Sequence, residues 1–184
     1  MGDDPRVREV LRCFFSELER PNETWAHKSK QTFFSWGACT FVTSSMIAIP
    51  GFRAAAQSRK ENVSMELVKR VRYQLENLQS PLKEAVVFER PHPSHGARVI
   101  SVCGEERESS FWALPEGGDQ WRFEQLTLAI LDELTYNRNA YASYTAALSA
   151  AEGGGKVLVI FTGVYNSWPN REAIAMLKRA HQVA

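Results

Sequence analysis

The sequence predicts an α+β or irregular α/β fold, because it contains both helical and strand-like segments. In some segments apolar residues recur at helical spacing, and in others they form short apolar runs bounded by turn residues. The two kinds of segment follow one another without the strict alternation that is typical of a doubly wound parallel sheet. The chain has 184 residues, so we expect a single domain.

The first half of the chain contains two predicted helices with a strand region between them. Apolar residues at helical spacing predict an N-terminal helix over residues 7–18, which Pro21 ends. Residues 32–49 are rich in aromatic and β-branched side chains, so we expect one or two strands there, followed by a turn at residues 50–51. A one-sided apolar face predicts the clearest helix of the chain over residues 64–79.

The middle of the chain predicts a β-hairpin. Apolar runs at residues 85–88 and 98–102 flank a turn that contains proline and histidine. Gly104 breaks the second of these strands, and we expect a short helix over residues 105–114.

The last part of the chain predicts a helix-strand-helix extension. Helical spacing is present over residues 123–134, and residues 139–151 are rich in Ala, Leu and Tyr. Residues 156–162 form an apolar run of the kind that is buried on both faces of a sheet. A final helix is expected to begin at residues 167–169.

Composition excludes several classes of protein. The net charge of +1 gives no global attraction to nucleic acid, so any DNA contact must come from a local patch. The three cysteines form no Cys-x-x-Cys pair, which argues against a disulfide framework or a closed zinc site and favours a reducing cytoplasm. No run of apolar residues is long enough to cross a membrane. We therefore expect a cytoplasmic protein, with the inner face of the bacterial inner membrane as a further location.

Two charged motifs are the candidates for binding phosphate. Gln57-Ser58-Arg59-Lys60 precedes the predicted helix at residues 64–79, and Gly104-Glu105-Glu106-Arg107 follows the predicted hairpin. A glycine after a strand lets backbone N–H groups approach an anion, and an arginine adds a bidentate charged donor. We expect the two motifs to face one anion pocket. The alternative is that each is an ordinary charged turn.

The order of these features resembles the ParB/sulfiredoxin-like domain. A strand at residues 46–49 leads to the first motif, a helix and a proline-led strand at 81–88 follow, and the second motif ends the segment. The resemblance implies a mixed sheet with flanking helices over about residues 46–114, with added N- and C-terminal segments. Glu106 stands where ParB proteins carry an arginine, and no helix-turn-helix follows the segment.

The resemblance also implies a nucleotide site that uses ATP or another nucleoside triphosphate together with Mg²⁺. The implied catalytic residues are Arg59, Glu105 and Arg107, with Glu105 and Glu106 as candidate metal ligands. The implied nucleotide-binding residues are Arg59, Lys60, Gly104, Arg107, Ser109 and Ser110. The expected contacts to the DNA backbone are Arg59, Lys60, Lys69, Arg70 and Arg72.

The organisation of the whole chain looks like that of plasmid fertility-inhibition proteins of the oncogenic-suppression type. That likeness implies ATPase and DNase activity that blocks conjugative or T-DNA transfer through type IV secretion. The implied partners are the transferred DNA, as T-strand or plasmid, and the secretion coupling protein. Two alternatives stay open: a non-enzymatic inhibitor that occludes a secretion-system partner, and a ParB-like partition or regulatory factor that binds DNA without turnover.

Three further features are interpreted as structural. Asp132-Glu133 falls on the predicted helix at 123–134 and is interpreted as a solvated face. The Gly153-Gly154-Gly155-Lys156 run is not a phosphate-binding P-loop, because no Ser or Thr follows the lysine and the run precedes a strand. Trp112 and Trp121 are assigned to the core, with stacking on nucleic-acid bases as the alternative.

Overall fold

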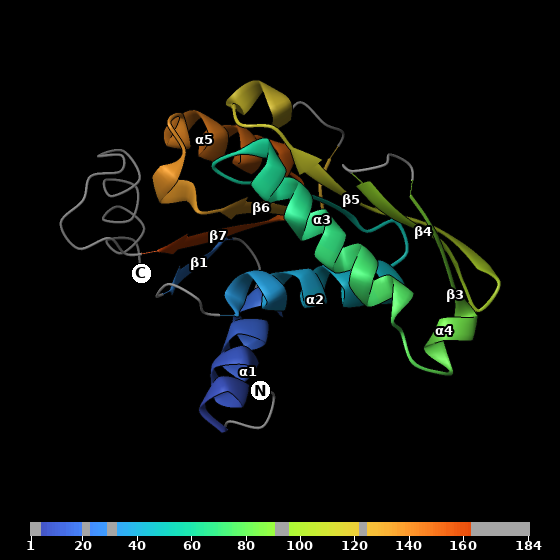
Figure 1. Ribbon diagram of the computed structural model, residues 1–184. Helices are drawn as coiled ribbons and strands as arrows, with labels where there is room; N and C mark the ends of the chain where they lie inside the picture. Colours follow the sequence, from blue (N-terminus) through green and yellow to red (C-terminus); the bar gives the residue numbers. More distant parts are fainter. Residues whose placement is uncertain (1–4, 20–22, 29–32, 91–95, 122–124, 163–184) are drawn as a thin grey trace.

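The computed structural model describes residues 5–19, 23–28, 33–90, 96–121 and 125–162. In these residues a seven-stranded sheet, with the strand order β1-β7-β6-β2-β5-β4-β3, is covered by helices (Figure 1). The strands are β1 (Glu23–Lys28), β2 (Arg53–Gln57), β3 (Val86–Glu89), β4 (Gly96–Val102), β5 (Glu105–Leu114), β6 (Leu128–Asp132) and β7 (Lys156–Thr162). The helices are α1 (Pro5–Glu19), α2 (Phe34–Ala48), α3 (Glu61–Glu76), α4 (Leu82–Ala85) and α5 (Ala140–Ala150), with 3₁₀ turns η1 (Gly118–Trp121) and η2 (Leu134–Tyr136).

Most of the sheet is parallel. Strands β1, β7, β6, β2 and β5 run in one direction, and β4 and β3 add an antiparallel edge. The prediction of a mixed sheet with flanking helices is therefore confirmed. The parallel majority makes the fold α/β, and it places the carboxyl ends of five strands at one edge of the sheet.

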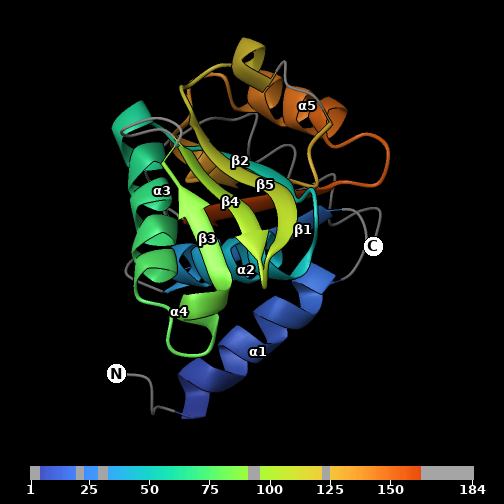
Figure 2. The ribbon, with the colours of Figure 1, turned by 90° about the vertical axis from the view of Figure 1, so that its right-hand side faces the viewer.

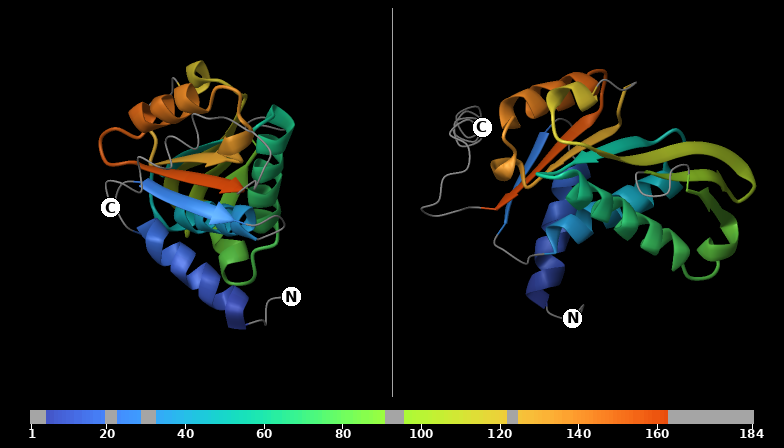
Figure 3. Two further views of the ribbon diagram at one scale, coloured as in Figure 1. Left: turned by 90° about the vertical axis from the view of Figure 1, so that its left-hand side faces the viewer. Right: turned by 45° about the horizontal axis from the view of Figure 1, so that its top comes forward.

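Helices cover both faces of the sheet, so the molecule has three layers. Helices α1, α2 and α3 lie on one face, and α5 with η1 lies on the other (Figures 2 and 3). The side chains of each central strand alternate between the two cores, as the period of a strand requires. In β2, for example, Ala54 and Ala56 belong to the core under α2 and α3, whereas Ala55 belongs to the core under α5.

Segment 34–48 is a helix and not the strand pair that its composition predicts. Its buried residues include Ala38, Cys39, Val42 and Met46, a helical spacing that faces the sheet. Burial against the sheet outweighs the weak strand preference of its aromatic and β-branched residues. The strand predicted at residues 46–49 is consequently wrong, and the ParB-like order of elements loses its first member.

Two predicted helices are strands. Residues 105–114 form β5, and residues 128–132 of the predicted 123–134 helix form β6. All five residues of β6 are buried, which is typical of a central parallel strand and explains why its apolar residues are consecutive.

Other predictions are confirmed. The structure contains the N-terminal helix as α1, the clearest helix as α3, the β3–β4 hairpin, the helix α5 and the buried strand β7. The final helix predicted from residue 167 lies outside the described residues. Within the described part of the chain, no helix is long and apolar enough to span a membrane.

Gly104 has a structural reason for being glycine. It forms the two-residue turn between β4 and β5 together with Cys103, and the pair Val102–Glu105 closes the hairpin. Both turn residues have positive φ, 52° for Cys103 and 80° for Gly104, as a type I′ turn requires. The glycine follows a strand, as expected, but it leads into another strand and not into a helix.

Candidate functional site

Polar side chains gather at the carboxyl edge of the parallel strands. Lys28, Gln57 and Asp132 are the last residues of β1, β2 and β6. In open α/β sheets ligands bind outside the carboxyl ends of the strands. A ligand site is therefore expected at this edge.

Asp132, Ser35 and Lys28 form the centre of this edge. The hydroxyl of Ser35, in the first turn of α2, donates to the Asp132 carboxylate, with distances of 3.4 Å to Oδ1 and 3.3 Å to Oδ2. Lys28 Nζ lies 3.2 Å from Ser35 Oγ and 4.0 Å from Asp132 Oδ1. The Lys28 and Asp132 side chains are only 10% and 5% exposed.

The carboxylate of Asp132 is buried, and this changes its pKa. Burial raises the pKa of Asp132 above its ordinary value, and neighbouring Glu133 adds to the rise. The positive charge of Lys28 and the hydrogen bond from Ser35 act in the opposite direction without cancelling it. A buried carboxylate beside a buried ammonium and a hydroxyl is the kind of arrangement that functional sites maintain at a cost in stability.

Glu133 is placed by an unusual backbone conformation. It follows Asp132 and has φ 54° and ψ 37°. This is the left-handed region, which residues other than glycine rarely adopt. Its Oε2 lies 2.9 Å from Nε of Arg59, and the Arg59 guanidinium lies 5.6 Å from the centre of the Tyr136 ring. Oε2 has no aligned hydrogen bond among the described residues, so its contact with Arg59 is an ion pair.

A buried amide network fixes the two segments that carry Arg59 and Glu133. Gln57 Nε2 donates to the carbonyl oxygens of Pro115 and Gly117, at 2.5 and 2.9 Å. Asn137 Nδ2 donates to Gln57 Oε1 at 3.3 Å and to Ser143 Oγ at 3.2 Å. The end of β2, the start of η1 and the start of α5 are thereby tied together.

The β1–α2 connection has the length of a P-loop but not its glycines. The P-loop pattern G-x-x-x-x-G-K-[ST] covers eight positions and ends in the Ser or Thr that binds Mg²⁺. From Lys28 to Ser35 the chain also covers eight positions and ends in a serine. Lys28, Phe33 and Phe34 stand where the pattern has its two glycines and its lysine. Among the described residues, Lys28 at the end of β1 brings an ammonium to this edge.

The donor set suits Mg²⁺ with a phosphate ligand. Ser35 and Asp132 converge as two hard oxygen donors, and Mg²⁺ is usually held by one or two protein oxygens together with phosphates and water. Among the described residues no cluster of three or more His, Cys, Asp or Glu side chains could hold a metal by itself.

The structure does not bring the two predicted motifs together. In the β2–β5 register Arg53 faces Ser110 and Gln57 faces Leu114. Arg59 lies two residues beyond Gln57, while Arg107 lies seven residues before Leu114, which separates them by about 30 Å along the sheet at ~3.3 Å per residue. The expected shared anion pocket is wrong, because the second motif lies at the amino end of β5.

The other predicted site residues are dispersed. Glu105 and Glu106 are exposed beside the Gly104 turn, and Ser109 is buried and donates to the carbonyl of Ile49. Ser110 pairs with Arg53 in the sheet. Lys60 is exposed just before α3.

Among the predicted DNA contacts, Lys69 is exposed and pairs with Glu66, at 2.5 Å. Arg70 lies over the Trp36 ring, at 5.4 Å from its centre. Arg72 is buried and donates to the carbonyl of Gly96, at 2.8 Å from Nε. Trp121 is buried, as the core assignment predicts.

Lys28 and Ser35 are not among the residues predicted from the sequence, and the interpretation of Asp132-Glu133 as a solvated face is wrong for Asp132, which is buried. The available signal was four consecutive apolar residues, 128–131, followed at once by two carboxylates. A buried parallel strand reads as a run of consecutive apolar residues, and a carboxylate directly after it lies at the carboxyl edge of the sheet.

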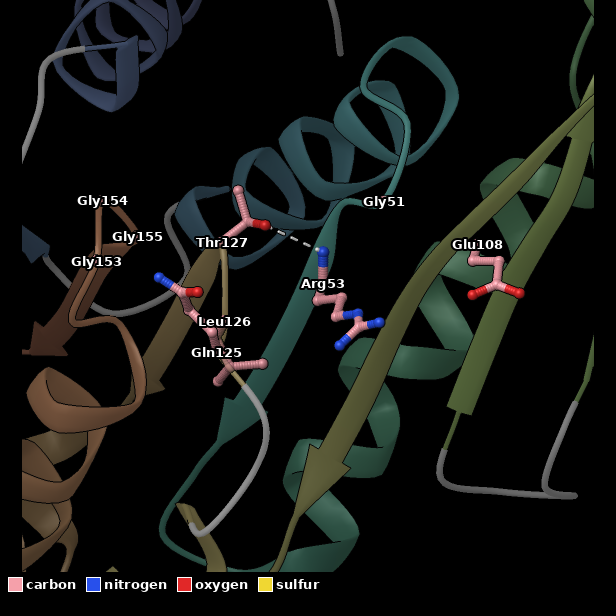
Figure 4. A pocket seen from close by; sticks show the side chains of 9 residues that line it. All are labelled: Gly51, Arg53, Glu108, Gln125, Leu126, Thr127, Gly153, Gly154 and Gly155. Carbon is pink, nitrogen blue, oxygen red and sulfur yellow. Dashed lines mark hydrogen bonds between the residues drawn. The ribbon is translucent and has the colours of Figure 1, made fainter.

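A pocket of about 450 Å³ lies at the opposite edge of the sheet (Figure 4). Its lining includes Arg53, Glu108, Thr127 and the glycines at 153–155, near the amino ends of β2, β6 and β7. The backbone N–H of Arg53 donates to Thr127 Oγ1 at 3.2 Å, which joins β2 to the start of β6. This pocket contains no carboxylate–hydroxyl pair like that of Asp132 and Ser35 among its described lining residues, so the candidate site is the carboxyl edge.

Comparisons with known proteins agree with this fold. No protein-family model and no curated protein sequence matches the chain. Among solved structures, the HK97 bacteriophage large terminase matches with a TM-score of 0.69 at 15% identity, over 100% of this chain and 38% of its own. The large terminase ATPase domain of Thermus phage P74-26 matches with a TM-score of 0.61 at 18% identity, over 80% and 61% of the two chains. The large terminase from another thermophilic bacteriophage, in complex with ADP, matches with a TM-score of 0.61 at 9% identity, over 86% and 38%.

These matches establish a fold like that of large-terminase ATPase domains. They overturn the ParB/sulfiredoxin resemblance, and the roles that it implied for Gly104, Glu105 and Arg107 lose their basis with it. The predicted fertility-inhibition function is also wrong, because it rested on that fold. The chain spans less than two thirds of the length of these three solved terminase chains.

Proposed function

We propose that the chain binds a nucleoside triphosphate with Mg²⁺ at the carboxyl edge of its sheet and hydrolyses it, as the ATPase unit of a terminase-like DNA-translocating motor. The observation that carries the proposal is buried Asp132 at the end of β6, bonded to Ser35 at the start of α2 and followed by Glu133. In P-loop NTPases the Mg²⁺ is held by a Walker-B Asp together with the Ser or Thr of the P-loop. The fold supports the proposal, as do structures of a thermophilic-phage large terminase in complex with ADP and with ATP-γ-S.

Each residue of the site has a defined task. Ser35 and Asp132 would hold the metal, which neutralises phosphate charge when it is bound. Lys28 brings a second positive charge to the same point, close to both oxygen donors, and offsets the charge that develops on the phosphates.

Glu133 is the candidate general base, because a carboxylate beside the metal ligand can accept a proton from the attacking water. Arg59 is a positioning residue, because its ion pair holds Glu133 at the edge of the site. DNA is the proposed polymer substrate of the whole motor, of which this chain would supply the nucleotide site.

The first test is nucleotide binding and turnover by the purified chain. We expect Mg²⁺-dependent binding of ATP-γ-S and release of phosphate from ATP. Asp132→Asn should lower both the affinity for the Mg²⁺ complex and the turnover by about 100-fold or more, since residues that only support a metal ligand already cost up to that much. Lys28→Ala should weaken binding of the triphosphate.

Lys69→Ala is a suitable control, because Lys69 is an exposed cation of α3 whose partner is Glu66. Unchanged binding in Asp132→Asn would overturn the proposal. Binding without phosphate release would favour a second function, a nucleotide-responsive domain without turnover. This second function is favoured by Phe33 and Phe34, which stand where the P-loop pattern has its second Gly and its Lys.

A further inference from the structure

Ser58 carries a buried hydroxyl group for which the described residues supply no partner. The residue is 2% exposed, and its Oγ has no hydrogen-bond partner in the described part of the chain. The other such side-chain atoms there are Glu133 Oε2, Thr135 Oγ1 and Trp121 Nε1. Three of these four atoms therefore belong to the segments that follow β2 and β6 at the carboxyl edge.

The sheet places Ser58 beside Asp132. The last registered pair between β2 and β6 is Gln57 with Leu131, so Ser58 and Asp132 are the next residues on adjacent chains. Ala54 and Ala56 share a core with Leu128 and Ile130, under α2 and α3. Because side chains alternate along a strand, Ser58 and Asp132 continue this face. It is the face from which Ser35 reaches Asp132.

A buried hydroxyl without a partner is costly, at about 1–3 kcal/mol, and most buried polar groups in proteins are satisfied. Ser64, another buried serine near this edge, follows that rule. It is 0% exposed and donates to the carbonyls of Glu61 and Leu114, at 2.8 and 2.9 Å. Ser58 is one of the exceptions to that rule, and its place next to Asp132 indicates what its partner is.

We propose that Ser58 is a ligand-binding residue of the nucleotide site, whose hydroxyl bonds an oxygen of the bound Mg²⁺–triphosphate complex. That oxygen belongs either to the terminal phosphate or to the water that lies against it. The inference rests on the proposed function and extends it, because it gives the site a residue that distinguishes a triphosphate from a diphosphate.

The test measures the stability and the affinity of Ser58→Ala together. Removing an unpartnered buried hydroxyl relieves its desolvation, so the ligand-free melting temperature should stay the same or rise, by up to about 4 °C. Affinity for ATP-γ-S with Mg²⁺ should fall about 10-fold, which corresponds to one lost hydrogen bond to a charged group. Affinity for ADP should not change.

Ser64→Ala is the matched control, because it removes a buried hydroxyl that already has partners. Its ligand-free melting temperature should fall, while its preference for ATP-γ-S over ADP stays that of the wild type. A ligand-free Ser58→Ala that melts below the wild type would show that Ser58 has a structural partner, and would overturn the inference.

The nucleotide arms separate this inference from the function on which it rests. If the wild-type chain binds neither nucleotide, the proposed function itself is wrong. If wild type and Ser58→Ala bind ATP-γ-S with equal affinity, only the role of Ser58 is wrong. Trapping of the Ser58→Ala chain with ADP and beryllium fluoride should be weakened for either oxygen, and kcat distinguishes the two: a kcat near that of the wild type assigns the contact to the terminal phosphate, and a lowered kcat assigns it to the water.

Discussion

At the level of single residues, the proposed site depends on Asp132, a carboxylate whose ionised form is disfavoured by burial. Burial raises the pKa of Asp132, so the ionised form costs free energy in the ligand-free protein. Proteins retain such groups where function needs them and tolerate the loss of stability. Lys28 and Ser35 reduce this cost but do not remove it.

The raised pKa predicts how stability depends on pH. The folded protein binds the proton of Asp132 more tightly than the unfolded chain does, so the contribution of this group falls as pH rises from the ordinary aspartate pKa through the raised one, and is flat above it. Asp132→Asn lacks this decline. The free energy of unfolding of the variant, compared with that of the wild type, should therefore be higher at neutral pH than in acid. Thermal unfolding from about pH 4 to about pH 8 measures the difference. Parallel curves for the two proteins would contradict the assigned burial of the charge.

The two arginines that the sequence predicted to bind phosphate, Arg59 and Arg107, should have different effects on ATPase activity. Arg59→Ala should lower kcat about 10-fold or more with little change in KM, because Glu133 loses the ion pair that positions it while the phosphate ligands remain. Arg59→Lys should recover part of the rate. Arg107→Ala, in the strand end about 30 Å away, should leave both constants unchanged. Steady-state ATPase assays of the three variants decide the matter, and a large loss in Arg107→Ala would restore the other edge as a site.

At the element scale, one-sided apolar faces predicted α1 and α3 correctly, and short apolar runs around a turn predicted the β3–β4 hairpin. The site was not predictable in the same way, because it depends on two elements whose local preference misleads. Segment 34–48 has a strand-like composition but is helical against the sheet, and β6 has apolar positions that also match helical spacing. With α2 and β6 misassigned, Ser35 and Asp132 could not be placed at one edge. Arg59 was predicted to bind phosphate, but with the wrong partner motif.

The β4–β5 turn offers a test of the corrected fold at this scale. Gly104→Ala should destabilise the protein by about 1–2 kcal/mol, because φ at this position is 80° and L-residues avoid that region. No described atom lies within 4 Å of an added Cβ, so the cost is conformational and not steric. Gly104→Asn should recover most of the stability, since asparagine tolerates the left-handed region. Denaturant unfolding measures the stability of both variants. A loss of nucleotide binding in a variant that remains folded would contradict a purely structural role for Gly104.

At the scale of the whole molecule, the three-layer arrangement explains why the site has this position. Five parallel strands direct their carboxyl ends to one edge, and α2 begins at that edge beside β6. The same arrangement underlies the match to large-terminase structures at identities of 18% or lower, where the fold is similar although few residues are identical.

We propose that the phosphates of a nucleotide lie at the edge formed by Lys28, Ser35 and Asp132. A crystal structure of the chain with ATP-γ-S and Mg²⁺ tests it most directly. We expect the metal between Ser35 and Asp132, with Lys28 against the phosphates. Density for the nucleotide at the Gly104 turn, or in the pocket beside Arg53 and Gly153–Gly155, with Asp132 still bound to Ser35 and Lys28, would contradict it.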